Sequence, residues 1–465
     1  MRKGYPWMGL FVALSLAGCQ QTAPKTVTAT PSAHPQAAVA EKPLPVPVKP
    51  WMWMTGARSE SQPSTKGIAG TEGVAAPGNT PPSVALAASW RGPHGGLYLL
   101  GGEGRYGLIH SGFWKYTPAT GLWMRIKGGS LIHADAAAWT GRHGGFWMFG
   151  GLEPNFKHPN AIPPTVDSLW RYTQKTGWVR MGGPRVNGPH VNDTQASGVR
   201  GTQGVASPKN WPGPRYDAAT WTGRHGDLWF FGGQSQTFTR NGLWKYTPST
   251  RMWTRMGGAG SFDEHLDGAW VAKPAVYGTR GVAAPGNWPG KRTDAVTWVG
   301  PHGSLWLFGG YGGSGSRNDL WKYTPKTGLW TWMGGHHGRP GVRGTLGVPA
   351  PTNWPGARSG AVGWTGPHGN LWLYGGGHAG DSLNSPNFVN DHSVWKYTVA
   401  TGLWTWMGSG HRKGNKKTGF VGTRGVPTDR GPDGASYACA WTGPHGHFWV
   451  FGGYGNLNDL WRYTP

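Results

Sequence analysis

Cysteine and helical patterning are both scarce in this chain of 465 residues. Only two cysteines occur, Cys19 and Cys439, which excludes a fold held together by a framework of disulfides. No window carries a sustained apolar stripe at helical spacing, so we expect almost no helix. The chain must therefore fold through strands and turns around an aromatic core, for which it supplies 31 tryptophans.

Acidic residues are also few. Asp and Glu number 20 against 44 Lys and Arg, which gives a formal net charge of +24. Such an excess predicts attraction to anionic surfaces. No nucleic-acid recognition motif accompanies the charge, so we expect no specific nucleic-acid partner. Two explanations stay open, contact with an anionic partner or a solvated surface suited to an unusual habitat.

An internal repeat dominates the rest of the sequence, and a clean copy runs from Thr293 to Gly335. A Gly-Gly pair begins at Gly101, Gly150, Gly232, Gly309, Gly375 and Gly452. A Trp-Lys/Arg-Tyr triplet begins at Trp114, Trp170, Trp244, Trp321, Trp395 and Trp461. Self-similarity at a fixed unit indicates a solenoid, a propeller or an array.

Each repeat has the pattern of four short strands. Residues 295–298 and 305–308 are rich in β-branched and aromatic residues, and they flank the turn signal Gly-Pro-His-Gly303. Residues 320–323 and 329–333 flank a second turn, Thr-Pro-Lys-Thr-Gly328. A lone sheet of this size buries too little apolar surface to be stable. Six such sheets arranged radially would cover one another's faces, which predicts a β-propeller.

The two ends of the chain predict how the ring closes. The last repeat stops at Pro465, before its fourth strand. A matching segment stands at the start, where Trp51-Met-Trp-Met-Thr-Gly56 is similar to Trp330-Thr-Trp-Met-Gly-Gly335. We therefore expect Trp51–Thr55 to complete the last of six blades and to remove an open edge.

In these motifs the chain resembles a kelch-repeat β-propeller of the galactose-oxidase/kelch-like type. The resemblance rests on the Gly-Gly pair that ends strand two and on the Tyr and Trp around the next hairpin, and it covers about Trp51 to Pro465. More narrowly, the blade linkers, such as Gly278 to Gly290, are similar to those of bacterial exported kelch proteins. The resemblance implies an all-β fold of six kelch-type blades at residues 51–465. It does not imply one function.

The first 50 residues read as a signal and a tether. Residues 1–18 combine Arg2 and Lys3 with a short apolar run, and they end in a sequence that resembles the bacterial lipoprotein box around Cys19. That resemblance implies a lipidated Cys19 and, with Gln20 following, sorting to the outer membrane. Residues 19–50 are rich in Pro, Ala and Thr, so we expect an extended tether. An ordinary signal with a chance cysteine is the alternative.

Strand direction places the loops on two faces. The turns between strands one and two and between strands three and four share one face, and they are short and uniform. The loops between strands two and three and the linkers between blades share the other face, and they are long and variable. Recognition residues concentrate on loops held by a rigid scaffold, so we assign binding to this variable face. One His stands in the first turn of every repeat, which a turn role explains: His94, His143, His225, His302, His368 and His445.

Three groups of residues in the variable loops are candidates for ligand or cation contact. They share carboxylate or imidazole side chains, whose spacing specifies no particular metal. We predict no cofactor, although a cation bound by these loops is conceivable on chemical grounds. The candidates are Asp263, Glu264, His265 and Asp267, then His336 and His337, then His378, Asp381, Asp391 and His392.

A basic cluster supplies the fourth candidate. Arg412, Lys413, Lys416 and Lys417 lie in the linker between the fifth and sixth repeats. Outside a cell, their expected partners are an envelope protein, a glycan or an anionic polymer such as lipopolysaccharide. The sequence leaves the oligomeric state open.

Enzymatic interpretations have weaker support. Copper galactose oxidases use a kelch-like propeller with a Tyr crosslinked to a Cys, but Cys439 lies in a repeat strand where other copies carry Ala138 or Val362. A sialic-acid epimerase of six kelch blades is nearer in architecture, yet no catalytic residue matches. No hydrolase elbow or phosphate loop occurs.

We therefore predict a lipid-anchored binding or scaffold propeller of the cell envelope, periplasmic or surface-exposed, with a sugar oxidase or epimerase-like enzyme as the alternative. Convergence of loop carboxylates and His in a closed pocket at the pore mouth would favour the enzyme, whereas a broad open face would favour binding.

Overall fold

The structure is a computed structural model. It describes residues 46, 49–56, 66–104, 108–128, 131–154, 163–183, 198–235, 239–258, 265–266, 269–270, 274–312, 315–378, 389–409, 423–432, 436–454 and 458–465. The predictions for residues 1–18, the lipidated Cys19 and most of the tether fall outside these ranges. No helix in the described ranges is long and apolar enough to cross a membrane.

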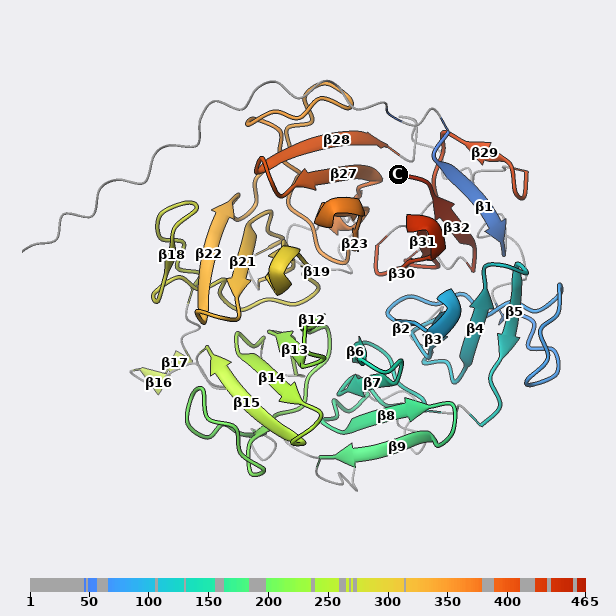
Figure 1. The fold of residues 1–465 in the computed structure, drawn as a ribbon, viewed down its shortest axis with the longest axis horizontal. Helices are drawn as coiled ribbons and strands as arrows, with labels where there is room; N and C mark the ends of the chain where they lie inside the picture. The colour runs from blue at the N-terminus through green and yellow to red at the C-terminus, as the bar shows by residue number, and fades with distance from the viewer. Residues whose placement is uncertain are drawn as a thin grey trace, which may run out of the picture. The chain divides into compact units, whose positions relative to one another are not determined.

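Six antiparallel sheets surround a central axis as the blades of a β-propeller, as predicted (Figure 1). The first three blades contain β2 (Ala88–Arg91), β3 (Leu97–Leu100), β4 (Phe113–Thr117) and β5 (Leu122–Arg125); β6 (Ala137–Thr140), β7 (Phe146–Phe149), β8 (Leu169–Thr173) and β9 (Gly177–Gly182); and β12 (Ala219–Thr222), β13 (Leu228–Phe231), β14 (Leu243–Thr247) and β15 (Met252–Gly257). The last three contain β19 (Val296–Val299), β20 (Leu305–Phe308), β21 (Leu320–Thr324) and β22 (Leu329–Gly334); β23 (Val362–Thr365), β24 (Leu371–Tyr374), β27 (Ser393–Thr398) and β28 (Leu403–Ser409); and β30 (Cys439–Thr442), β31 (Phe448–Phe451), β32 (Leu460–Tyr463) and β1 (Trp51–Thr55).

Shorter elements decorate the blades. Four turns between strands one and two form 3-10 helices: η2 (Pro93–Gly95), η4 (Pro301–Gly303), η5 (Pro367–Gly369) and η6 (Pro444–Gly446). The two-residue strands are β10 (Gly198–Val199), β11 (Trp211–Pro212), β16 (His265–Leu266), β17 (Ala269–Trp270), β18 (Ala283–Ala284), β25 (Gly377–His378), β26 (Val389–Asn390) and β29 (Pro427–Thr428).

The N-terminal strand closes the ring, which confirms the predicted topology. β1 pairs antiparallel with β32, with Trp51 opposite Tyr463 and Trp53 opposite Trp461. The Trp51 ring is buried against Tyr463, at a centroid distance of 4.9 Å. On its other side β1 pairs with β29, so the outer edge of this blade is also covered.

The repeated Trp at the end of each first strand joins neighbouring blades. In five blades its indole N–H donates to a backbone carbonyl in the second strand of the next blade, as from Trp298 to Trp372 O at 2.9 Å. The other four donors are Trp90, Trp139, Trp221 and Trp441. Trp364 differs, because its ring stacks on Phe448 at 4.9 Å. These tryptophans therefore hold blade to blade, which is why every repeat carries one.

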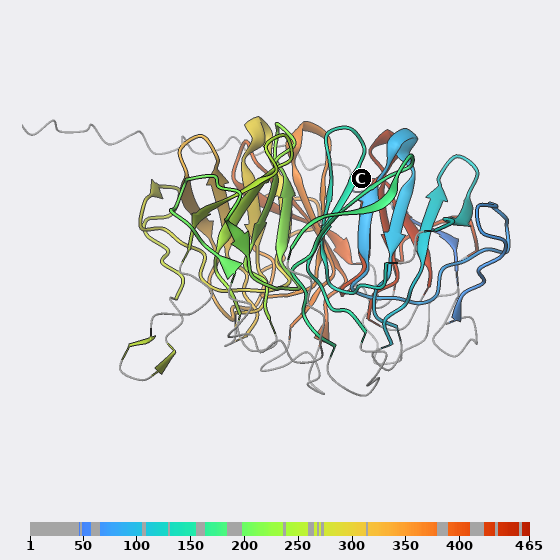
Figure 2. The same ribbon diagram turned by 90° about the horizontal axis from the view of Figure 1, so that it is seen from below.

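The turns and loops separate into two faces, as Figure 2 shows. We call the face that carries the turns between strands one and two, and between strands three and four, the short-turn face. The opposite face carries the loops between strands two and three and the ends of the linkers, and it is the variable face. Each second strand is buried on both sides, because each blade packs between two others.

Candidate functional site

One position in each blade faces the axis at the variable-face end of the channel. It lies two residues before the first strand of the blade, where the chain turns inward from the linker. All six residues have a left-handed φ, between 56° and 62°. We call these residues the axial ring: Leu86, Asp135, Asp217, Asp294, Gly360 and Tyr437.

Backbone hydrogen bonds link the axial ring into a closed circle. The N–H of each residue donates to the carbonyl oxygen of its counterpart in the preceding blade, with N···O distances of 2.7–3.2 Å. Asp135 N bonds to Leu86 O, and the circle closes where Leu86 N bonds to Tyr437 O at 3.0 Å. The circle fixes the six side chains around one opening, and this requirement accounts for their shared left-handed backbone.

Three carboxylates stand side by side on this circle, from blades two, three and four. Burial raises the pKa of Asp135 well above its ordinary value, and the charges of Asp294 and Glu103 raise it further. Burial and the two neighbouring carboxylates likewise raise the pKa of Asp217. Burial raises the pKa of Asp294 to about 6, although a hydrogen bond from Thr293 lowers it. Burial and mutual repulsion therefore favour the protonated form of these carboxyl groups.

Aromatic and amide side chains complete the opening. Tyr437 is buried, and its ring lies beside Gly360, where a Cβ would meet it at 2.7 Å. Tyr454 contacts Tyr437 edge to face at a centroid distance of 5.2 Å. Gln234 donates to Asp217 at 3.5 Å. We call the axial ring together with Glu103, Gln234 and Tyr454 the channel mouth.

The channel mouth keeps unused polar capacity. Asp217 and Asp294 are half-buried, whereas Asp135 is 8% exposed. The Oδ1 atom of Asp135 has no hydrogen-bond partner among the described residues. No ion pair among those residues involves any of the three carboxylates. A buried carboxylate oxygen without a partner is costly, and a ligand that donates hydrogen bonds would satisfy it.

The side chains of the channel mouth suit a hydrogen-bonding ligand. In the described part of the chain, no three His, Cys, Asp or Glu side chains are arranged to hold a metal ion. The mouth instead combines carboxyl groups, an amide and two tyrosines, which are the groups that bind hydroxyl-rich molecules. The carboxyl groups accept or donate hydrogen bonds, and the aromatic rings supply flat apolar surfaces.

A second feature of the variable face is a cleft between blades four and five, with a volume of about 740 Å³. Three of the residues predicted from the sequence line it, namely His337, His378 and Asp391. Three arginines line it as well, namely Arg339, Arg343 and Arg358. We call it the arginine cleft.

The charged groups of the arginine cleft differ in burial. Asp391 and the buried Arg358 form an ion pair at 3.0 Å, and Asp391 also accepts from Ser393 N at 2.7 Å. Burial would raise the pKa of Asp391, but the Arg358 guanidinium lowers it below its ordinary value. This pair therefore supports the cleft wall. His337, His378 and Arg339 are exposed and can meet a ligand.

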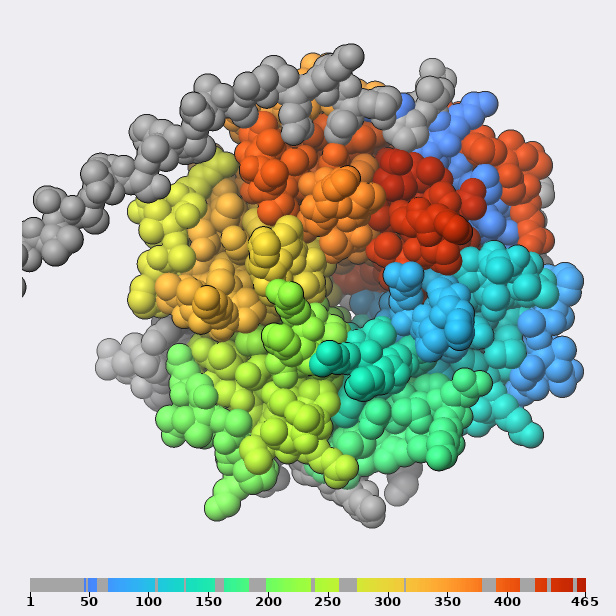
Figure 3. Space-filling model, viewed as in Figure 1, coloured from blue at the N-terminus to red at the C-terminus, as the bar shows by residue number. Residues whose placement is uncertain are grey.

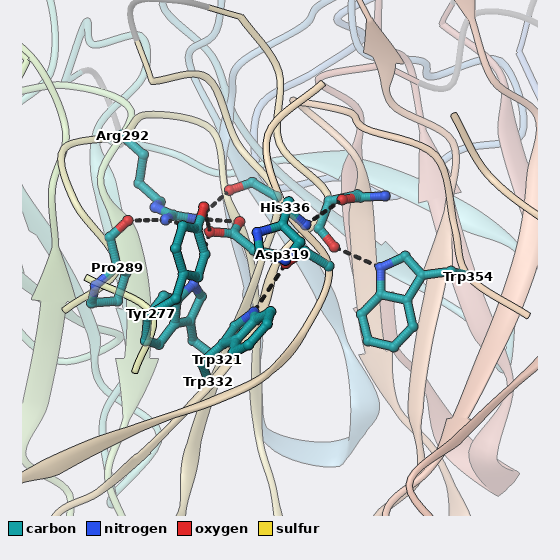
Figure 4. A network of polar contacts seen from close by, with 11 residues as sticks. Tyr277, Pro289, Arg292, Asp319, Trp321, Trp332, His336 and Trp354 are labelled. Atoms are coloured by element: carbon teal, nitrogen blue, oxygen red, sulfur yellow. Dashed lines mark hydrogen bonds and ion pairs between the residues drawn. The ribbon is translucent and has the colours of Figure 1, made fainter. Parts of the chain in front are cut away.

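His336, the neighbour of His337, belongs to a structural network (Figure 4). Its ring contacts Tyr277 and Trp332 at 4.9 and 4.8 Å, and its backbone N–H donates to Asn318. Close by, Arg292 and Asp319 form a fully buried ion pair at 2.8 Å. The arrangement commits His336 to packing.

The other residues predicted from the sequence lie apart from these two sites or outside the described ranges. His392 is half-buried between Asp391 and β27, and His265 lies in β16. The remaining ones fall outside the described residues: Asp263, Glu264, Asp267, Asp381, Arg412, Lys413, Lys416 and Lys417.

Cys439 has a packing role in β30. The thiol is buried and donates to Ala87 O at 3.5 Å, and burial raises its pKa to about 12. A thiol held in this protonated form is a poor nucleophile and metal ligand.

Sequence reasoning missed the channel mouth because its carboxylates read as ordinary members of the repeat. Asp135, Asp217 and Asp294 stand directly before the first strands, in the most regular part of each copy. One signal was available in the sequence: the residue two positions before the first strand is Asp in three repeats and Leu, Gly or Tyr in the others, whereas the strand that follows is similar in every repeat. Comparison with protein-family models finds no match for this chain, and comparison with curated proteins finds none either.

Proposed function

We propose that this protein is a lipid-anchored propeller of the bacterial cell envelope that binds a glycan or an envelope protein through its variable face. The channel mouth is its recognition centre, and the arginine cleft is an accessory contact for an anionic group on the same ligand. The propeller acts as a rigid scaffold of the kelch type and presents both sites on one side.

The observation that carries the proposal is the convergence at the channel mouth. Carboxylates from three consecutive blades meet two tyrosines of the sixth blade there, and one carboxylate oxygen lacks a partner within the part of the chain that the structure describes. A sugar presents several hydroxyl donors and an apolar face within one small volume, which matches this set of groups. A protein loop with a hydroxyl or amide side chain would match it less completely.

A binding experiment with matched variants tests this role. The full chain is screened on an array of glycans and envelope polymers, and the best ligand is then titrated against Asp217→Asn and Tyr454→Phe. We expect each variant to lose about ten-fold in affinity, because each removes one hydrogen bond of roughly 1.5 kcal/mol to the ligand. Asp429→Asn, which changes an exposed carboxylate beside β29 at the outer edge of blade six, is the control. Binding that all three variants leave unchanged would refute the channel mouth as the recognition centre.

A carbohydrate-active enzyme is the second candidate function, and one observation favours it. Asp294, with a pKa of about 6, stands beside Asp217 in the axial ring, so one carboxyl group can hold a proton while its neighbour lacks one. Such a pair can work as general acid and base on a sugar. Incubation of the array's ligands with the protein, followed by NMR of the sugars, would reveal epimerised or oxidised products.

A further inference from the structure

The short turns carry more positive than negative charge, whereas the carboxylates described above belong to the opposite side. The turns between strands one and two and between strands three and four carry five exposed Lys or Arg residues against one carboxylate, Asp227. These cations are Arg142, Lys175, Arg224, Arg251 and Lys326. The six turn histidines are all exposed on the same face.

A second set of cations reaches this face from inside the blades. Every third strand carries a Lys or Arg at its centre, and four of these lean over an aromatic ring of the second strand, as Lys322 does over Trp306 at 5.7 Å. Their side chains extend toward the short turns, since Lys115 Cε lies 3.1 Å from the Cβ position of Gly96. Lys322 and Lys396 line a cleft of about 640 Å³ together with His302 and His368.

The chain also enters and leaves the propeller on the short-turn face. Pro50 O accepts a hydrogen bond from Thr464 N, immediately before β1 begins. The Thr464 hydroxyl contacts the His447 ring at 3.3 Å, and His447 belongs to a short turn of blade six. About thirty residues separate Cys19 from this point.

We infer that the short-turn face docks on an anionic lipid surface. The cations would contact headgroup phosphates, each contributing on the scale that juxtamembrane Lys and Arg residues do. The docked propeller would present its variable face, with the channel mouth, away from the lipid. The charge pattern stands without the anchor, whereas the tether's part in the inference rests on the lipid anchor of the proposed function. Figure 3 shows this face, with the blades around a hollow at the axis.

Vesicle binding by charge-reversal variants tests the inference. The full chain carries Cys19→Ser throughout, so that no acyl chain contributes, and is mixed with vesicles of phosphatidylcholine alone or with an equal part of phosphatidylglycerol. The test variant combines Lys175→Glu with Lys326→Glu, both in exposed short turns. The control combines Lys66→Glu with Lys127→Glu, which are exposed near the opposite ends of the strands. Both variants change the net charge by the same amount.

We expect the test variant to lose at least ten- to thirty-fold in affinity for the anionic vesicles, roughly what two juxtamembrane cations contribute, while the control stays within about two-fold of the parent. Raising the salt concentration should reduce the difference. Equal losses in both variants would mean that net charge alone acts, and no loss in either would remove the short-turn face from lipid contact. Either result overturns the inference. It would also be overturned if the parent bound a soluble acidic polysaccharide but no vesicles, and the test variant lost that polysaccharide binding. Ligand binding at the channel mouth should be unchanged in the test variant, so this result is separable from failure of the proposed function.

Discussion

At the scale of single residues, the carboxylates of the channel mouth occupy an electrostatically unfavourable environment. Each is crowded by another carboxylate, and none of the three has an ion-pair partner among the described residues. Such groups make the folded state bind protons more tightly than the unfolded chain does. Their presence therefore costs stability at neutral pH, a cost that active or binding sites commonly carry.

Replacing Asp294 with Asn should change how stability depends on pH. The folded pKa of Asp294 is about 6, above the unfolded value near 4. In the parent, stability contributed by this group is therefore full below about pH 4 and is lost as pH rises through 6. The variant lacks this loss, so its stability relative to the parent should rise between pH 4 and 6, by about 1 to 3 kcal/mol, and then level off. Urea unfolding across pH measures the difference, and a constant difference would contradict the raised pKa.

At the scale of strands, the closing strand β1 is held by buried aromatic contact as well as by backbone pairing. Trp51 and Met52 are neighbours in β1, but only the Trp51 ring is fully buried, against Tyr374 and Tyr463. We expect Trp51→Ala to cost about 3 to 5 kcal/mol of unfolding free energy. Met52→Ala, whose side chain is half-buried, should cost markedly less.

Thermal and urea unfolding of these two variants compare them directly, and light scattering reports whether an opened edge aggregates. Equal costs for Trp51→Ala and Met52→Ala would mean that the strand is held by its backbone alone.

Strand-level features were predictable from the sequence, and the channel mouth was not. The Gly-Gly pairs, the turns and the truncated last repeat each report local chemistry, so six blades and the closure by Trp51–Thr55 followed from them. Asp135, Asp217 and Asp294 lie 82 and 77 residues apart along the chain, by subtraction of their numbers. Their meeting depends on the curvature of the assembled ring, which no local pattern encodes. The arginine cleft is similar, because His337 and His378 come from different blades.

At the scale of the whole molecule, the two faces differ in chemistry. The proposed anchor would hold the short-turn face toward the membrane and the variable face away from it. Changing Cys19 to Ser should release the protein from the membrane fraction or leave it unprocessed, because acyl chains supply membrane affinity of about 0.8 kcal/mol per buried CH₂. Detergent phase partitioning compares parent and variant. If both partition into the aqueous phase, the protein is not a lipoprotein, although charge-driven docking of the short-turn face would remain testable on its own.

The hydrogen-bonded circle at the channel mouth also has an electrostatic consequence. Its six N–H···O=C hydrogen bonds run in one rotational sense, so the components of their dipoles across the axis cancel. A helix, by contrast, accumulates its dipoles into charged ends and leaves unpaired donors and acceptors there. A closed circle has no ends, so these six donors and six acceptors are all paired. The groups that an approaching ligand meets at this opening are then side chains, and replacing a single axial residue changes their chemistry without altering the backbone circle.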